Sequence, residues 1–255
     1  MAEIDLDALK DSLVRREVSV GREPPTTVPR EHVETMTAAA DEVLECLRVL
    51  DKGDVNLVGE ILRDEGKFVE WNHYPKGDIY DNETHSQFYY HAHPSDLRAP
   101  EHGHFHTFMR AKGLPKSIKP APMPTSVTRP TGKDAIGHLV GISMDKQGLP
   151  IWMFTTNRWV TGESWYAAED VIKMLDLFDI DHAAPSWPTN RWVGAMIRLF
   201  RPQVEWLLRE RDEAVRIWQA GHPDDPAYED HGLEVPSRIQ ISIDDQVRRV
   251  RAAAS

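Results

Sequence analysis

The segment Tyr89-Tyr90-His91-Ala92-His93-Pro94 and, after a short connection, the segment Glu101-His102-Gly103-His104-Phe105-His106 decide how this chain is interpreted. Half of the chain's 12 histidines lie between His85 and His106. Each segment contains a His-x-His pair, and side chains two residues apart lie on the same face of an extended chain. The pattern predicts two strands with imidazoles on one face and aromatic or small residues on the other.

The connection between the two segments contains the turn-forming residues Pro94, Ser95 and Pro100. A loop of this length would bring the two His-x-His pairs close together, as a metal site requires. Imidazole suits zinc, copper, iron and nickel, and a neighbouring carboxylate such as Glu101 favours a mixed set of nitrogen and oxygen ligands. We therefore predict that the two pairs supply the metal ligands, namely His91, His93, His104 and His106.

A histidine-rich surface loop is the alternative interpretation of this part of the chain. For His85 or His102 taken alone it is the favoured one, because a lone histidine is commonly solvated or hydrogen-bonded. His73 stays open between two roles, a ligand (with Glu70 as the alternative ligand) or a histidine bonded to the backbone. Two His-x-His pairs on predicted strands favour the metal site.

Other residues are candidates for roles beside the two pairs. His138 begins a later apolar strand and is predicted to be a ligand or a proton donor. Arg158 closes the next strand and could orient an anionic or carbonyl group, with a loop-stabilising role as the alternative. Tyr89 or Tyr90 could donate a proton or orient bound oxygen, and one of the two should lie on the ligand face and the other in the core. Glu101 could be a ligand or a base, so the predicted catalytic residues are Glu101, Tyr89 and Arg158.

The composition is that of a soluble globular protein. The chain has 255 residues, of which 40% are hydrophobic and 28% charged. No apolar run approaches the roughly 18 residues that a membrane span needs. The N-terminus lacks the features of a signal peptide, and the single cysteine, Cys46, rules out an intramolecular disulfide. We therefore expect a cytoplasmic, reducing location.

The formal net charge of −11 argues against nucleic acid as a partner, since a nucleic-acid binder needs a basic face. The same charge disfavours anionic membrane surfaces. A small-molecule substrate is the expected partner. A homo-oligomer that forms through the terminal segments is left open as a second kind of partner.

The periodicity predicts an α+β fold with an antiparallel sheet, for which a barrel-like form is one option, packed by N-terminal and C-terminal helices. Residues 1–30 should form an arm or linker and residues 31–255 a single domain. Within that domain we expect helices over 31–66, the sheet over 68–160, helices over 164–220 and a terminal strand and helix over 236–255.

Several local signals set the boundaries of these elements. Gly53 should end the first helix, with Asp54 capping the second. Pro75 to Asp78 is predicted to be a turn after a strand that starts at Phe68. Ser164 is expected to cap a helix, and Pro202 should split the long apolar helix that ends at Gly221.

Motifs for other chemistries are absent from the sequence. There is no glycine-rich dinucleotide turn, phosphate loop, Gly-x-Ser-x-Gly elbow or His-Glu-x-x-His helix. Over about residues 88–157, the His-x-His pair and the later His138 resemble the metal site of cupin barrels. In cupins a glutamate follows the pair, whereas Thr107 to Lys112 contains no carboxylate and Glu101 precedes the pair instead. The family is therefore not assigned from the sequence.

The favoured function is a metal-dependent oxidoreductase, a non-haem iron oxygenase that uses Fe(II) and acts on a small molecule. A zinc-dependent hydrolase or lyase is the first alternative, because similar ligands lower the pKa of a zinc-bound water. Copper would also suit a three- or four-histidine set. A haem enzyme and a non-catalytic metal-binding protein complete the alternatives.

Overall fold

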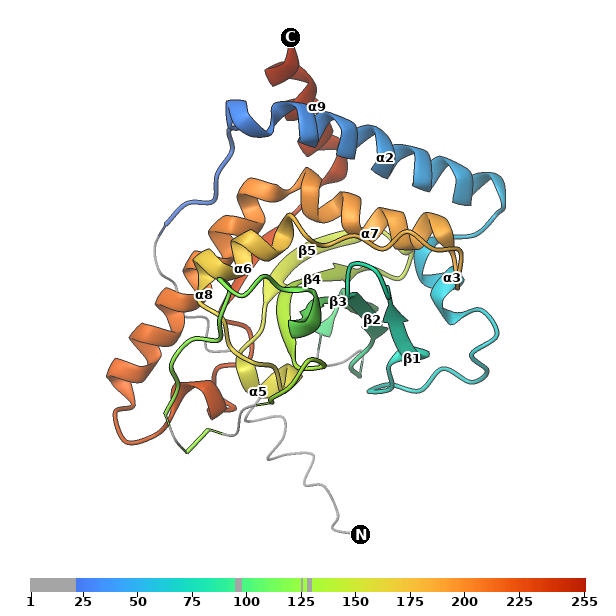
Figure 1. Ribbon diagram of the computed structural model, residues 1–255. Helices are drawn as coiled ribbons and strands as arrows, with labels where there is room; N and C mark the ends of the chain where they lie inside the picture. The colour runs from blue at the N-terminus through green and yellow to red at the C-terminus, as the bar shows by residue number, and fades with distance from the viewer. Residues whose placement is uncertain (1–21, 95–97, 125, 128–129) are drawn as a thin grey trace.

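The computed structural model describes residues 22–94, 98–124, 126–127 and 130–255. Its centre is a six-stranded antiparallel sheet in which each strand pairs with the next along the chain (Figure 1). The strands are β1 (Tyr74–Tyr80), β2 (Ser86–His91), β3 (Gly103–Arg110), β4 (Ile136–Met144), β5 (Pro150–Thr155) and β6 (Ser237–Gln240). The sheet is open, with β1 and β6 at its two edges, so the barrel-like option is not realised.

Helices precede and follow the sheet, as the α+β prediction requires. The α-helices are α2 (Val33–Lys52), α3 (Leu57–Leu62), α5 (Arg158–Thr161), α6 (Ala168–Leu175), α7 (Trp187–Leu199), α8 (Arg201–Gly221) and α9 (Ile243–Ala254). Short 3-10 turns are η1 (Arg30–His32), η2 (Ala111–Gly113) and η3 (Ala227–Glu229). None of the helices in the described part of the chain has both the length and the apolar character of a membrane-spanning segment.

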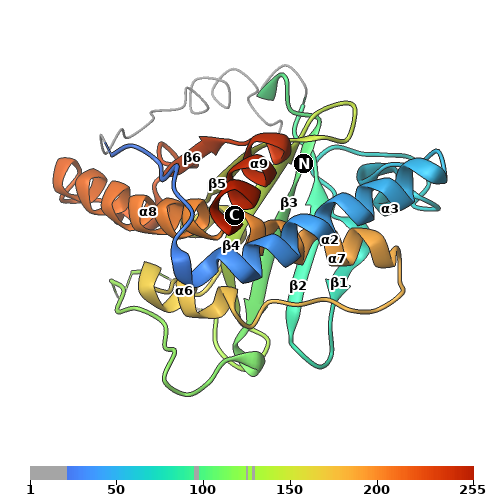
Figure 2. The same ribbon diagram turned by 90° about the horizontal axis from the view of Figure 1, so that it is seen from above.

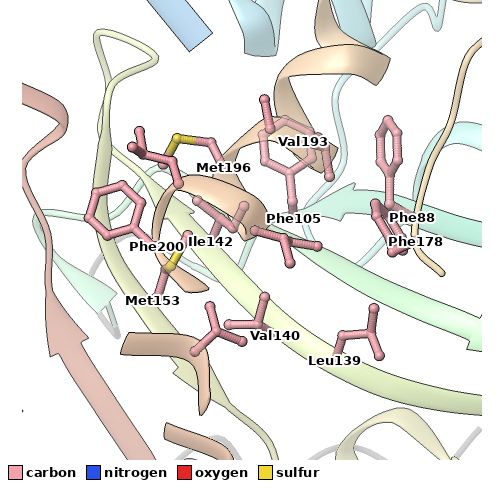
Figure 3. Packing of buried hydrophobic residues seen from close by; sticks show 14 of the residues in the cluster. Phe88, Phe105, Leu139, Val140, Ile142, Met153, Phe178, Val193, Met196 and Phe200 are labelled. Atoms are coloured by element: carbon pink, nitrogen blue, oxygen red, sulfur yellow. The ribbon is translucent and has the colours of Figure 1, made fainter. Parts of the chain in front are cut away.

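Three of the helices form layers on one face of the sheet, whereas α5 lies on the other side of it (Figure 1). Helix α7 lies over the strands, and α2 and α9 lie beyond it, on the side away from the sheet (Figures 1 and 2). Apolar side chains of the sheet, among them Phe105 and Ile142, pack against Val193 and Met196 of α7 (Figure 3). The hydrophobic core therefore lies between this face of the sheet and the helices. The opposite face of the sheet is available for the residues of the predicted site.

The register of β2 and β3 places the predicted site on that opposite face. Tyr90 pairs with Phe105 on the helix-covered side. Their neighbours His91 and His104 also pair with each other, and they point the other way because side chains alternate along a strand. The alternation predicted for these two strands is confirmed.

A β-bulge changes the alternation in β4. His106 pairs with Gly141 and Phe108 pairs with His138, so one residue of β3, Thr107, faces two residues of β4. The Thr107 hydroxyl lies 2.7 Å from the carbonyl oxygen of Val140 and 3.2 Å from its backbone nitrogen. It thereby satisfies backbone groups that the bulge withdraws from the ladder. As a result His138 lies on the same face as His106.

Three predicted boundaries are wrong, each for a local reason. Strand β1 starts at Tyr74 and runs through Pro75, because an edge strand tolerates a residue without an N–H donor. The second helix is capped by Asn56, whose side chain accepts from the Gly59 amide, instead of by Asp54. Helix α6 starts at Ala168, since the Ser164 hydroxyl donates to the Pro130 carbonyl and caps nothing.

Other boundaries agree with the prediction. Gly53 follows the last residue of α2, and the long C-terminal helix is divided at Phe200, just before Pro202. The terminal strand pairs with β5 and so occupies the edge of the sheet. Most of the expected arm, residues 1–21, lies outside the described residues.

Candidate metal centre

Three histidines bring their ring nitrogens together on the face of the sheet turned away from α7. One ligand atom from each of His91, His93 and His104 lies within 4.8 Å of the others. The closest pair is Nε2 of His91 and Nε2 of His104, which are 2.7 Å apart. We call these three residues the histidine trio. Their spacing is compatible with a single cation bound between them.

His93 completes the trio from just beyond the end of β2. Its ring centroid is 4.9 Å from that of His91 and 5.3 Å from that of His104. Its Nδ1 atom is buried and has no hydrogen-bond partner among the described residues. A buried nitrogen without a hydrogen-bond partner is costly, and binding of a metal ion by Nδ1 of His93 would remove this cost.

Glu101 orients His104 from the side opposite the trio. The Nδ1–H of His104 donates to Oε1 of Glu101 at 2.8 Å, which leaves the lone pair of His104 on Nε2, facing His91. This carboxylate–histidine contact is the usual outer-shell support of a metal-bound imidazole. Glu101 therefore acts on the trio through His104 in this arrangement.

The surroundings of Glu101 keep its carboxylate ionised. Although burial opposes the charge, the contacts with His104, Arg98 and Ser143 lower the pKa of Glu101 to about 2. The Arg98 guanidinium also forms an ion pair with Glu234. Glu101 is thus a permanent anion that is shared between an imidazole and a guanidinium.

The imidazoles of His91 and His93 are neutral. Burial, together with the nearby His104, His73 and Arg98, lowers the pKa of His91 to about 2. The pKa of His93 is lowered in the same direction, mainly by burial and by Arg98. Neutral imidazole is the form that binds a metal, so no proton has to leave these rings before a cation enters.

His106 and His138 form a second pair beside the trio. Nδ1 of His106 lies 3.0 Å from Nε2 of His138, and Nδ1 of His138 lies 3.3 Å from the hydroxyl oxygen of Thr156. The ring centroid of His106 is 4.7 Å from that of His104. These two predicted ligands are thus adjacent to the trio but are bonded to each other. That they bind the metal themselves stays a prediction.

The two tyrosines lie on opposite faces, as expected. The Tyr89 ring is on the histidine face, with its centroid 5.2 Å from that of His106 and 3.6 Å from that of His73, on which it stacks. Burial raises the pKa of Tyr89, so its phenol keeps its proton. The Tyr90 hydroxyl lies 2.7 Å from Nδ1 of His102 and its ring belongs to the core.

Arg158, the third predicted catalytic residue, is the first residue of α5. Its guanidinium forms an ion pair with Glu229 of η3, and its backbone nitrogen donates to the side chain of Asn157. This contact resembles the loop-stabilising role that was the alternative. A catalytic role for Arg158 stays a prediction.

Several residues that shape the centre have no signal in the sequence. Phe154 lies under the histidines, with its ring centroid 5.2 Å from that of His104, and it needs Gly141 opposite it, because a Cβ there would be 2.4 Å from its ring. Glu163 is fully buried, accepts from the backbone N–H of His138, and has its pKa raised by burial to about 7. Glu163 lies in the loop between α5 and α6, where a carboxylate is ordinarily exposed, so no pattern in the sequence marks it as buried.

Comparisons with known proteins place the chain in a family. A family model described as Domain of unknown function (DUF6969) matches residues 37–241, a range that holds all six strands and every histidine discussed above. No curated protein and no solved structure matches the chain. Because the family model covers most of its length, the chain belongs to the family described as Domain of unknown function (DUF6969).

Proposed function

We propose that this protein is a metal-dependent oxidoreductase, an oxygenase that acts on a small molecule with Fe(II) held by the histidine trio. The observation that supports the proposal most is the convergence of three imidazoles, with ligand atoms within 4.8 Å of one another. Three nitrogen donors leave open positions on Fe(II), which then supplies the activation of dioxygen beside a bound substrate. A cytoplasmic, reducing location belongs to the same proposal.

The chain's own residues would prepare this centre in three ways. Glu101 fixes the ring of His104 so that Nε2 faces the ion, because its carboxylate accepts from Nδ1. Phe154 contacts His104 and His106 and keeps water from the inner side of the centre. Tyr89 stays protonated on the same face and could donate its phenolic proton to a bound oxygen atom.

One observation favours a second candidate function, a zinc-dependent hydrolase or lyase. The trio contains no carboxylate, because the nearest one, Glu101, is bonded to Nδ1 of His104. An all-imidazole set with one open position is a known catalytic zinc arrangement, in which the pKa of the bound water falls to about 7. Copper would accept the same nitrogen donors.

Metal analysis of the full chain purified without chelator, together with an absorption spectrum, separates these candidates. Iron without a Soret band supports the oxygenase, zinc supports the hydrolase or lyase, and an intense Soret band would replace both with a haem protein. His104→Ala should reduce the metal content to near zero. His182→Ala is the matched control. His182 lies in the loop before α7, where its ring contacts Asn190 and none of the trio. Equal metal content in both variants would overturn the proposed centre.

A further inference from the structure

Trp71 is held in an unfavourable backbone conformation beside the centre. Its φ angle is 71°, in the left-handed region that a bulky residue rarely adopts. The backbone N–H of Trp71 donates to the carbonyl oxygen of Ala92 at 2.9 Å, and Ala92 lies between His91 and His93. The strained residue is thus tied to the same short segment that carries two members of the trio. Strain of this kind is concentrated at ligand-binding sites.

The indole of Trp71 lies at the edge of the centre and is 49% exposed. Its ring centroid is 4.3 Å from that of His93, with an angle of 70° between the planes. A second aromatic pair, His73 stacked on Tyr89, lies next to His91, since the ring centroids of His73 and His91 are 5.8 Å apart. We call Trp71, His73 and Tyr89 the aromatic rim.

The charge of the loaded centre also restricts what can bind there. Imidazole binds a metal ion in its neutral form, so the trio adds no charge to the ion that it holds. Glu101, the carboxylate that contacts the trio, lies 2.8 Å from His104 and 3.8 Å from the Arg98 guanidinium, and Asp78 lies 3.3 Å from His73 on the rim side. A divalent ion therefore keeps most of its positive charge, which an anionic oxygen donor would complement.

From the rim and the charge together, we propose that Trp71 determines substrate specificity by stacking on the aromatic ring of a small aromatic acid or phenol. The oxygen donor of that molecule would reach the ion held by the trio. Trp71 contacts His93, so a ring that stacks on the indole lies next to a ligand of the metal. The inference rests on the proposed metal centre, whichever metal occupies it, and adds the class of molecule that the centre accepts.

The test uses the full chain loaded with Co(II), whose visible absorption changes when a ligand enters its coordination shell. Benzoate and cyclohexanecarboxylate have the same charge and nearly the same size, and only benzoate has a π-face. We expect benzoate to bind about threefold to tenfold more tightly, as an aromatic pair predicts. Trp71→Leu should abolish this preference and leave the affinity for cyclohexanecarboxylate unchanged, whereas Trp71→Phe should retain most of it.

Trp187→Leu is the matched control, because Trp187 is 51% exposed but belongs to α7, on the other side of the sheet. Circular dichroism verifies that each variant is folded. If wild-type protein binds Co(II) but binds the two acids equally, or if Trp71→Leu keeps the preference, the inference is wrong while the metal centre stands. If wild-type protein binds no Co(II), both the metal centre and the inference are wrong.

Discussion

Nε2 of His91 and Nε2 of His104 face each other at 2.7 Å across two neighbouring strands. Because His104 keeps its proton on Nδ1 for Glu101, the hydrogen between the two Nε2 atoms belongs to His91. A cation between the rings would replace this hydrogen bond, and His91 would then carry its proton on Nδ1. The change is a switch of tautomer, so the number of bound protons stays the same.

This arrangement predicts a metal affinity that hardly depends on pH near neutrality. An exposed histidine loses its ligand capacity as the pH falls through about 6.5, whereas the pKa of His91 is about 2. At His91 and His93, protons therefore compete with the metal only in strong acid. Between pH 7.5 and pH 5.5, Co(II) affinity measured by competition titration should fall by less than about tenfold. Three ordinary imidazoles would lose roughly a thousandfold or more over that range.

Replacing Glu101 tests the outer support of the trio. Glu101→Ala should weaken metal binding by about 10- to 100-fold, since His104 loses the acceptor that fixes its ring. Glu101→Gln offers an amide oxygen at the same place and should recover part of the loss. Metal titration of the three proteins measures the effect. Equal losses in both variants would show that the negative charge matters more than the orientation.

Glu163 should make the free energy of unfolding depend on pH. Burial raises its pKa from 4.5 to about 7, so its contribution to stability is complete below pH 4.5 and is lost as the pH rises through 7. Glu163→Gln keeps an oxygen acceptor for the His138 amide and should stabilise the protein at pH 8 by at most about 3 kcal/mol. Urea unfolding at pH 8 and pH 5 measures the difference. Exposed Glu83→Gln should change neither value.

Gly141 is required by the ring of Phe154. A Cβ at position 141 would lie 2.4 Å from that ring, which is confined by His104 and His106. Gly141→Ala should therefore lower the free energy of unfolding by about 1–3 kcal/mol and weaken metal binding as well. Thermal unfolding and metal titration measure the two effects. At Gly59, in α3, a Cβ would meet nothing nearer than 3.4 Å, and Gly59→Ala should be neutral or stabilising.

The part of the fold that follows from simple periodicity could be predicted from the sequence. Alternation alone places His91 and His104 on one face and Tyr90 and Phe105 on the other, as the strand register confirms. The start of β1 could not be predicted, because Pro75 is tolerated only where the strand has a free edge, and that depends on the order of strands.

The candidate site could also be predicted only in part. The histidine-rich strands are visible in the sequence, but the partners of each ring are not. The division into a trio and the pair of His106 and His138 depends on side-chain directions that spacing cannot give. Trp71 was missed because an isolated tryptophan in a loop carries no pattern, and its approach to His93 comes from a backbone contact with Ala92.

The bulge in β4 sets the phase of that strand. Ahead of it, His138 points toward the histidines, and beyond it Gly141 and Ser143 do so as well, although an odd number of positions separates His138 from both. Strict alternation over these three positions would turn the His138 ring to the hydrophobic side of the sheet, and the bulge prevents this. The place of this imidazole beside the other histidines therefore depends on one extra residue in β4, and deletion of Leu139 or Val140 would leave His138 on the same face as Gly141 without needing the irregularity.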